Sequence, residues 1–398
     1  MIDKLAIAGG KPTRKTYLPY GSQSIDETDI KRVVETLKSD WITQGPKVEE
    51  FEKEVAKYCG AKYAVAVATG TAALHCATYA SGLDKGMEGI TSPITFAASA
   101  NSIEFRGAKP RFADINQRTY NISPSEIKRQ INQKTKVLIP VDFTGQPCEI
   151  DEINEIAIEE DLAVIQDSAH GFGSLSQGRK LGSLADMTIF SFHPVKHLTT
   201  GEGGIILTNN EEYFEKMKLF RTHGITNDKA QMEENHGPWY YEMKELGYNY
   251  RITDIQCALG ISQLSKIDQF IKRRRQIATI YDVELSKFDE ILTPYQLPST
   301  ESSYHLYVVK LNLEKLRCDR KKIFDALRAE NIGVHVHYIP VHLQPYYRKK
   351  YNYKKGSFPN AEDYYDKALT LPLFPKMTDN DAYDVITSLR KVLNHYKK

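Results

Sequence analysis

Long hydrophobic runs are absent from this sequence of 398 residues. No window approaches about 18 consecutive apolar residues, so neither a transmembrane span nor a membrane partner is expected. Residues 1–4 lack the charged-then-apolar layout of a signal peptide. Cysteine is scarce as well, because the five cysteines are far apart and have no CxxC spacing. This pattern argues against a disulfide framework or a zinc site and favours reduced thiols in a cytoplasmic protein.

An excess of charge of one sign is also missing, because 53 Lys and Arg residues nearly balance 51 Asp and Glu residues. A net charge of +2 gives no basic patch that would favour nucleic acid as a partner. We interpret the basic run at residues 272–275, which lies within a helical pattern, as a solvated helix face. Neither GxGxxG nor GxxxxGK[ST] occurs, which argues against a dinucleotide or a P-loop nucleotide. His170 and His193 have no further ligand at metal spacing, so no metal is predicted.

Between about residues 60 and 210, short apolar runs alternate with helical patterns. This rhythm predicts an α/β fold in which a mostly parallel sheet carries helices on both faces. Seven runs are the expected strands: residues 63–68, 89–92, 110–113, 137–141, 162–166, 187–190 and 205–208.

A long helical pattern at residues 254–288 leads into a smaller α+β domain. Its expected elements are strands at residues 304–311 and 334–338 and helices at residues 320–330 and 379–396. We therefore expect two domains, residues 1–255 and 256–398.

Two of the expected strands end in residues with reactive side chains. Asp167 follows the run at 162–166, and Lys196 follows the run at 187–190, on a polar turn that ends in a glycine cluster. The carboxyl ends of parallel strands meet at the edge of the sheet where ligands bind. A lysine there can form a Schiff base with pyridoxal phosphate, and an acid can keep the ring nitrogen protonated. Alone, each residue could be a surface lysine or a turn aspartate, but the combination favours the cofactor.

Thr69, Gly70 and Thr71 follow a strand and open a helix, where free N–H groups and hydroxyls form an anion site for a phosphate. Taken alone, an ordinary helix N-cap explains the same residues more simply. Ser191 is placed to donate to the same phosphate as Thr71. Phe96 lies at a strand-to-helix turn, where it would either stack on a pyridine ring or pack in the core.

In this order, the segments resemble the sugar aminotransferases of the DegT/DnrJ/EryC1/StrS family, a branch of the fold-type I pyridoxal-phosphate enzymes. The resemblance covers nearly the whole chain, through residues 41–48, 68–74, 191–204, 247–251 and 337–342. Two positions depart from the common pattern: His170 stands where many members have Gln, and Thr69 where many have Ser or Asn.

The resemblance implies a role for each matching residue. Lys196 would carry the cofactor, and Asp167 would pair with its ring nitrogen. Further cofactor contacts are implied for Gly70, Thr71, Phe96, His170 and Ser191. Asn249 would reach the cofactor phosphate of the neighbouring subunit, so that the active sites of a homodimer are shared. The candidate sugar contacts are Thr43, Arg221, His223, His337, Tyr338 and His342.

Within the family, residues 191–204, 221–226 and 336–347 resemble the branch that acts in pseudaminic acid biosynthesis. This implies transfer of the amino group of L-glutamate, which leaves as 2-oxoglutarate, to C4 of a UDP-linked 4-keto-6-deoxy-N-acetylhexosamine. Open alternatives are an aminotransferase that acts at C3 or on a dTDP-sugar, a keto-sugar 3-dehydratase and a non-catalytic regulatory protein. The dehydratases replace the Schiff-base lysine by histidine, so Lys196 argues against them. The presence of both Lys196 and Asp167 argues against the non-catalytic regulatory protein.

Overall fold

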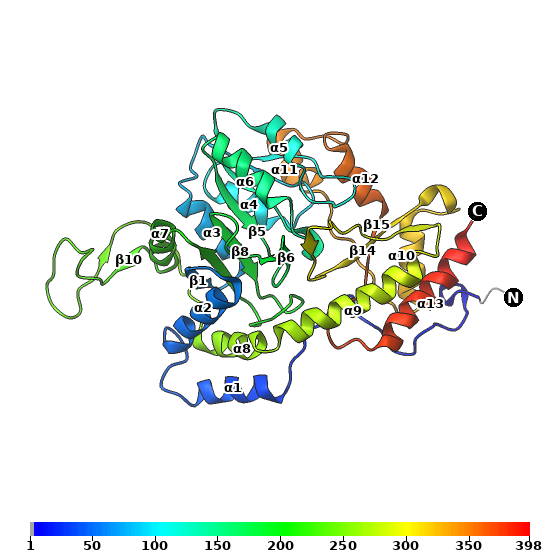
Figure 1. Cartoon of the computed structure of the whole chain (residues 1–398), viewed down its shortest axis with the longest axis horizontal. Coiled ribbons are helices and arrows are strands. Elements are labelled where there is room, and N and C mark those ends of the chain that lie inside the picture. The colour runs from blue at the N-terminus through cyan, green and yellow to red at the C-terminus, as the bar shows by residue number, and fades with distance from the viewer. Residues whose placement is uncertain (1–3) are drawn as a thin grey trace.

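A computed structural model describes residues 4–398 of the chain (Figure 1). Its centre is a seven-stranded sheet in the order β1–β9–β8–β5–β4–β2–β3. The strands are β1 (Tyr63–Val67), β2 (Glu88–Thr91), β3 (Lys109–Phe112), β4 (Thr135–Ile139), β5 (Ala163–Asp167), β8 (Met187–Ser191) and β9 (Gly204–Thr208). Strand β9 runs antiparallel to both of its neighbours, and the other neighbouring pairs are parallel. The predicted α/β fold with seven mostly parallel strands is confirmed.

Both faces of the sheet are apolar, because helices cover both of them. Helices α3 (Gly70–Ala80), α4 (Ala98–Phe105) and α7 (Glu211–Arg221) cover one face, where Val65 and Val67 lie in the core. The alternate residues Ala64 and Ala66 point to the other face, beneath α2 (Pro46–Cys59) and α8 (Asp254–Leu264). Helices α5 (Pro124–Gln130) and α6 (Ile150–Glu159) continue that second layer over β2, β4 and β5. In the described part of the chain, no helix is long and apolar enough to cross a membrane.

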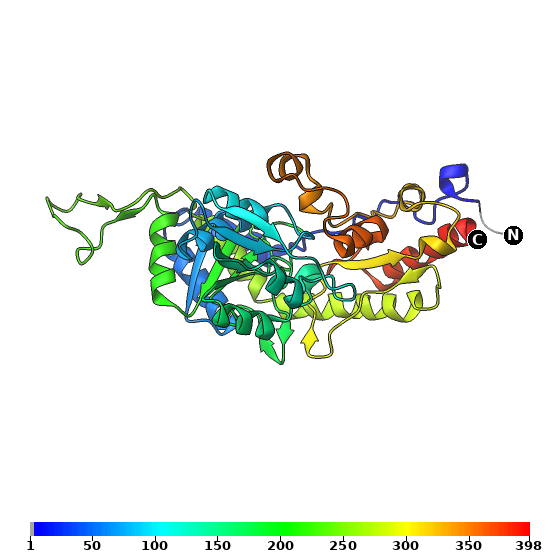
Figure 2. The same ribbon diagram turned by 90° about the horizontal axis from the view of Figure 1, so that it is seen from above.

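Helix α9 (Ile267–Leu285) runs from the sheet into the second part of the molecule (Figures 1 and 2). There β12 (Ile291–Leu292), β14 (Tyr307–Leu311) and β15 (Ala368–Leu371) form an antiparallel sheet. Helices α10 (Arg320–Ala329) and α13 (Asp379–Tyr396) share its core. Leu5 and Leu18 belong to the same core, so the chain around these two residues packs on the second part, although the sequence analysis grouped it with the sheet domain.

Two expectations for local structure are wrong. Residues 334–338 form an irregular segment in which His335 makes an isolated bridge to Thr370. The helical pattern at 254–288 is two helices, because α8 ends at Leu264 and α9 begins at Ile267. In the break, the Ser265 hydroxyl donates to the Ser262 carbonyl, and such local bonds compete with helix continuation.

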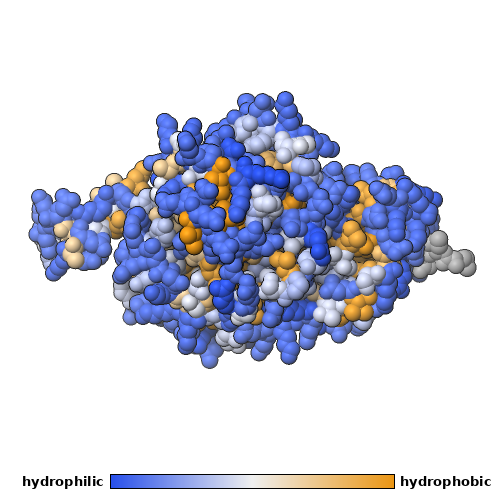
Figure 3. Space-filling view, turned by 45° about the horizontal axis from the view of Figure 1, so that its top comes forward, coloured by the Kyte–Doolittle hydropathy of each residue, from blue (hydrophilic) through white to orange (hydrophobic). Residues whose placement is uncertain are grey.

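Residues 222–249 extend from the body as an arm (Figures 1 and 2). It contains the short antiparallel pair β10 (Ile225–Thr226) and β11 (Glu242–Met243). The arm carries exposed apolar side chains, visible as orange and tan atoms among blue ones in Figure 3. Trp239 is 75% exposed and Leu246 is 76% exposed. Since apolar surface of this kind is costly in water, the arm has the character of a contact surface.

Candidate active site

Lys196 lies on the loop that joins β8 to β9. Both ends of the loop are fixed, because Ser191 pairs with Gly204 in the antiparallel ladder. The N–H of the buried Phe192 donates to the Gly203 carbonyl at 2.9 Å. The lysine side chain therefore starts from a held backbone just beyond the carboxyl end of β8.

The glycines of this loop allow it to lie against the start of α3. A Cβ atom on Gly204 would lie 2.5 Å from the Thr69 carbonyl oxygen, and a Cβ on Gly70 would lie 2.9 Å from the Ser191 Cβ. Thr69 is the N-cap of α3, as its hydroxyl accepts from the Ala72 N–H at 3.0 Å. The N–H groups of the first turn, including those of Gly70 and the next residue, have no partners within a helix. With the Ser191 hydroxyl beside them, they fit a bound phosphate.

Asp167 ends β5 and is buried. Its Oδ2 accepts from the Ser99 hydroxyl at 2.7 Å, and its Oδ1 accepts from the Ala169 N–H at 3.1 Å. Burial raises the pKa of Asp167, and these two hydrogen bonds oppose the rise. A cation beside the carboxylate would stabilise its charged form, and a protonated pyridine nitrogen is such a cation.

The amine of Lys196 is poised to be a nucleophile. Burial lowers the pKa of Lys196 to about 7; Asp167 opposes that shift, and the guanidinium of Arg274 adds to it. At neutral pH a substantial fraction of the side chain is therefore an unprotonated amine, which is the reactive form.

Four buried or partly buried rings surround this amine. The His305 Nε2 lies 3.4 Å from the Lys196 Nζ, and the ring of His170 lies 4.3 Å from that of His305. The His170 Nε2 contacts the Tyr338 hydroxyl at 3.1 Å, and the His197 ring lies 5.6 Å from that of His305. Burial lowers the pKa of each of the three histidines well below its usual value. The imidazoles are therefore neutral at neutral pH.

Phe96 supplies an open aromatic face at the rim of the site. Its ring is 62% exposed and lies 6.1 Å from the Tyr338 ring. Of the two roles considered for Phe96, burial in the core is thus wrong, and an exposed ring fits stacking on a planar ligand. The acid, the lysine, the phosphate cradle and this ring together fit pyridoxal phosphate. Within residues 4–398, no group of three His, Cys, Asp or Glu side chains is arranged to hold a metal ion.

The other residues expected at the site differ in their burial and in the contacts that they make. Thr71 is partly buried in the first turn of α3, Thr43 and His223 are exposed, and Asn249 is exposed at the base of the arm. The His337 Nδ1 contacts the Thr370 hydroxyl at 2.9 Å, and its ring adjoins that of Tyr338.

Two of the expected sugar contacts are engaged inside the chain. Arg221 lies 2.6 Å from Glu52 and donates to the Ala66 carbonyl at 2.8 Å. His342 is completely buried, and its Nε2 lies 3.0 Å from Glu362. His342 thus offers no exposed atom to a sugar, and the guanidinium of Arg221 is held by an internal ion pair.

Sequence reasoning missed His305 and misplaced Arg274. Arg274 is buried, not solvated, and its NH1 group donates to the carbonyls of Tyr304, His305 and Leu373 at 3.2, 3.2 and 3.0 Å. It thereby holds the chain that leads into β14 against α9. The signal for His305 was its place within the expected strand at residues 304–311, but nothing nearby in the sequence links it to Lys196.

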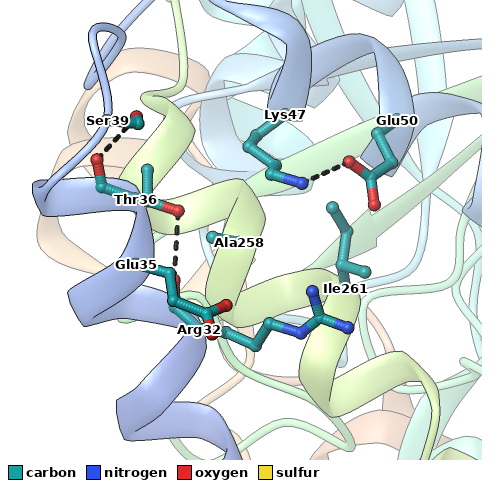
Figure 4. Close-up of a pocket in the computed structure, with 8 residues that line it drawn as sticks. All are labelled: Arg32, Glu35, Thr36, Ser39, Lys47, Glu50, Ala258 and Ile261. Atoms are coloured by element: carbon teal, nitrogen blue, oxygen red, sulfur yellow. Dashed lines mark hydrogen bonds and ion pairs between the residues drawn. The ribbon is translucent and has the colours of Figure 1, made fainter.

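The hollow shown in Figure 4 lies elsewhere, between α1 (Glu27–Leu37), α2 and α8. It has a volume of about 180 Å³ and contains the Lys47–Glu50 ion pair at 2.6 Å. Neither Lys196 nor any ring around it lines this hollow, so it is separate from the candidate active site.

A mostly parallel seven-stranded sheet with a lysine on the β8–β9 loop and an acid at the end of β5 defines the class of fold-type I pyridoxal-phosphate enzymes. Residues 23–390 match the model of the DegT/DnrJ/EryC1/StrS aminotransferase family, and the chain belongs to that family. It is therefore an aminotransferase. Similar solved structures include the putative sugar aminotransferase Spr1654 of Streptococcus pneumoniae in its PMP form and its PLP form, each with a TM-score of 0.89.

Three relatives indicate where the chain lies within the family. The spore coat polysaccharide biosynthesis protein SpsC of Bacillus subtilis is 42% identical over 381 residues, which are 96% of this chain and 98% of that protein. A UDP-4-amino-4,6-dideoxy-N-acetyl-beta-L-altrosamine transaminase of Campylobacter jejuni is 38% identical over 384 residues, covering 96% and 99%. The structure of Helicobacter pylori PseC, an aminotransferase of pseudaminic acid biosynthesis, superposes with a TM-score of 0.89 at 31% identity, covering 96% and 100%.

Proposed function

We propose that this protein uses pyridoxal phosphate to transfer the amino group of L-glutamate to C4 of a UDP-linked 4-keto-6-deoxy-N-acetylhexosamine. Such a reaction belongs to the biosynthesis of pseudaminic acid or a related surface glycan, and we place it in the cytoplasm. The observation that carries the proposal is the placement of Lys196 on the loop after β8, in the same site as the buried carboxylate of Asp167 at the end of β5. The similarity to the C. jejuni transaminase and to PseC supports the choice of sugar.

When bound, the cofactor supplies an aldehyde for the amine and a ring that withdraws electrons from the substrate carbon. Lys196 would hold the cofactor through Nζ. Once released, its amine would carry the proton away from the glutamate Cα in the first half-reaction and would deliver a proton to the sugar C4 in the second. The Asp167 carboxylate would accept the N–H of the ring nitrogen and so keep that proton in place. Both half-reactions use one site, so ping-pong kinetics are expected.

The geometry around the lysine supports the proposed cofactor contacts. The first turn of α3, with Gly70 and Thr71, and the Ser191 hydroxyl would bind the phosphate. Phe96 would cover one face of the ring. His170, held by the Tyr338 hydroxyl, is placed to contact the cofactor's 3-oxygen. Of the expected sugar contacts, Thr43, His223, His337 and Tyr338 remain in the proposal, because their side chains are exposed or border the His170 cluster.

We also propose that the protein is a homodimer in which each subunit completes the other's active site. The arm supports this, because it carries Trp239 and Leu246 exposed and has Asn249 at its base. A stripe on α1 adds to the apolar surface, since Ile30, Val34 and Leu37 are exposed at helical spacing. In the dimer, Asn249 would donate to the phosphate held by the partner.

The homodimer is tested by placing charges on the arm. The double variant Trp239→Asp, Leu246→Asp should be monomeric by size-exclusion chromatography with light scattering, and should lose activity together with the dimer. Ile158→Asp, on the exposed surface of α6, is the matched control and should remain dimeric. A dimeric, active arm variant would contradict the proposed interface.

The reaction is tested with ¹⁵N-glutamate and a panel of UDP- and dTDP-linked 4-keto-6-deoxy sugars. We expect ¹⁵N in a UDP-sugar product, with proton couplings that place the amine at C4, and no product from Lys196→Ala. Loss of water without a new nitrogen would favour the keto-sugar dehydratase instead. A protein that binds no cofactor and aminates none of the sugars would be a non-catalytic member of the fold.

A further inference from the structure

The contact between Lys196 and His305 joins the two parts of the molecule. Lys196 lies on the loop after β8, whereas His305 precedes β14 in the second part, 109 residues later. His305 is buried, and the peptide group that joins it to Leu306 is held by two hydrogen bonds: the His305 carbonyl accepts from Arg274, and the Leu306 N–H donates to the Thr144 carbonyl. An imidazole held this firmly has a defined position relative to the amine.

The surroundings of His305 select one of its two neutral tautomers. Its Nδ1 is buried without a hydrogen-bond partner among the described residues, while its Nε2 lies 3.4 Å from the Lys196 Nζ. A proton on Nδ1 would be a buried, unpaired donor, which costs more than a bare acceptor. The proton therefore belongs on Nε2, where it points to the lysine.

We propose that His305 is a positioning residue for Lys196, whose Nε2–H donates to the lone pair of the unprotonated lysine Nζ. This bond exists only with the neutral amine, so it favours that form and directs the nitrogen. The proposal rests on the proposed function in one respect: it takes Lys196 as the lysine that carries the cofactor.

The other groups around this contact do not replace it. Asp167 and Arg274 act on the amine through their charges and oppose each other. His170 and His197 adjoin the ring of His305 and are neutral, and His337 borders Tyr338. Among the described side chains, His305 makes the one hydrogen bond to Lys196 Nζ that the structure contains.

Two substitutions separate this role from packing. The amide of a glutamine reaches the place of an imidazole Nε2, whereas that of an asparagine reaches only the place of Nδ1. His305→Gln therefore keeps a donor near the lysine, and His305→Asn keeps the polarity but loses the contact. Equal thermal unfolding of the two variants would establish that both are folded.

The test uses the full-length chain freed of bound cofactor. Acetic anhydride acylates Lys196 at a series of pH values, and mass spectrometry of the peptide that contains Lys196 measures the extent of acylation. In His305→Asn, we expect the pKa of Lys196 to rise by roughly 0.7 unit, as the loss of one hydrogen bond predicts, with about fivefold less neutral amine below pH 7. His305→Gln should stay within about 0.3 unit of the native chain. In the cofactor-loaded enzyme, kcat should fall in His305→Asn while the KM for glutamate is unchanged.

A fall in the pKa of Lys196 in His305→Asn, no change, or an equal rise in both variants would overturn the proposal. If His305→Asn does not fold, ¹⁵N shifts of the native histidine rings decide, and a proton on Nδ1 of His305 would refute it. Acylation requires no transamination, so a failed sugar assay and a failed His305 test are distinguishable.

Discussion

Replacing Asp167 by asparagine should separate the reactivity of the lysine from catalysis. The introduced side chain is nearly isosteric, and its amide oxygen can still accept a hydrogen bond, but the charge that faces the ring nitrogen is lost. Breaking one side of a buried charge pair costs about 3–5 kcal/mol. If the transition state needs the ring proton throughout, this corresponds to a loss of roughly a hundredfold to several thousandfold in rate.

The same substitution should leave the amine at least as reactive as before. Asp167 raises the pKa of Lys196, so its neutralisation lowers that pKa from about 7 and increases the neutral fraction at pH 6.5. Acetic anhydride should therefore acylate Lys196 at least as fast in the cofactor-free variant as in the native chain.

The assay is a single turnover with glutamate in the cofactor-loaded protein, followed by absorbance. Ser99→Ala is the matched control, because it removes one hydrogen bond to the Asp167 Oδ2 and keeps the charge. Its rate should fall by about tenfold or less. An Asp167→Asn rate within tenfold of the native rate would refute the assignment of Asp167 as the partner of the ring nitrogen.

Four further outcomes are expected. Lys196→Ala should yield no covalently bound cofactor after borohydride reduction and should lower transamination by several orders of magnitude; a label on another lysine would contradict this. Gly204→Ala should weaken cofactor binding and lower the free energy of unfolding in urea by more than about 2 kcal/mol. The added carbon would lie 2.5 Å from the Thr69 carbonyl oxygen. An unchanged free energy of unfolding would argue against the close packing of β9 on α3. Arg274→Met should cost about 3–5 kcal/mol, because three buried carbonyls lose their donor, and a change below about 1 kcal/mol would contradict the burial of the guanidinium. The free energy of unfolding should fall as the pH drops below about 6.5, because His170, His197 and His305 have lowered folded-state pKa values and are protonated first in the unfolded chain. These three groups contribute a slope of up to about 4 kcal/mol per pH unit, and His75, His337 and His342 add to it in the same direction. A flat profile from pH 6.5 to 5 would show that these rings are not neutral in the fold.

The sheet and its two reactive residues could be predicted from the sequence for one physical reason. Strands buried on both faces are continuous apolar runs, so the polar residue that follows each run marks the edge of the sheet where ligands bind. Asp167 and Lys196 are such residues. Phe96 was also expected near this edge, because it lies at a strand-to-helix turn, but the sequence did not decide whether its ring is exposed or buried.

The remaining features depend on contacts between distant segments. His305 reaches Lys196 only because the second part of the molecule packs over the loop after β8, and no local pattern records that approach. The burial of Arg274 was hidden for a similar reason, since its neighbours at 273 and 275 lie at the surface of α9 and form surface ion pairs. Arg221 and His342 were expected to contact the sugar, but Glu52 and Glu362 are their partners within the chain.

The reversed direction of β9 limits how far the lysine can travel. A parallel strand at this place would need a crossover of a dozen or more residues that ends at the opposite edge of the sheet. The antiparallel strand β9 instead begins beside the end of β8. The loop that carries Lys196 therefore starts and ends at one pair of bonded residues, Ser191 and Gly204. Between these anchors Phe192 and Leu198 are buried in the core under the sheet, so the amide of Phe192 should exchange with solvent as slowly as those of β8 and β9.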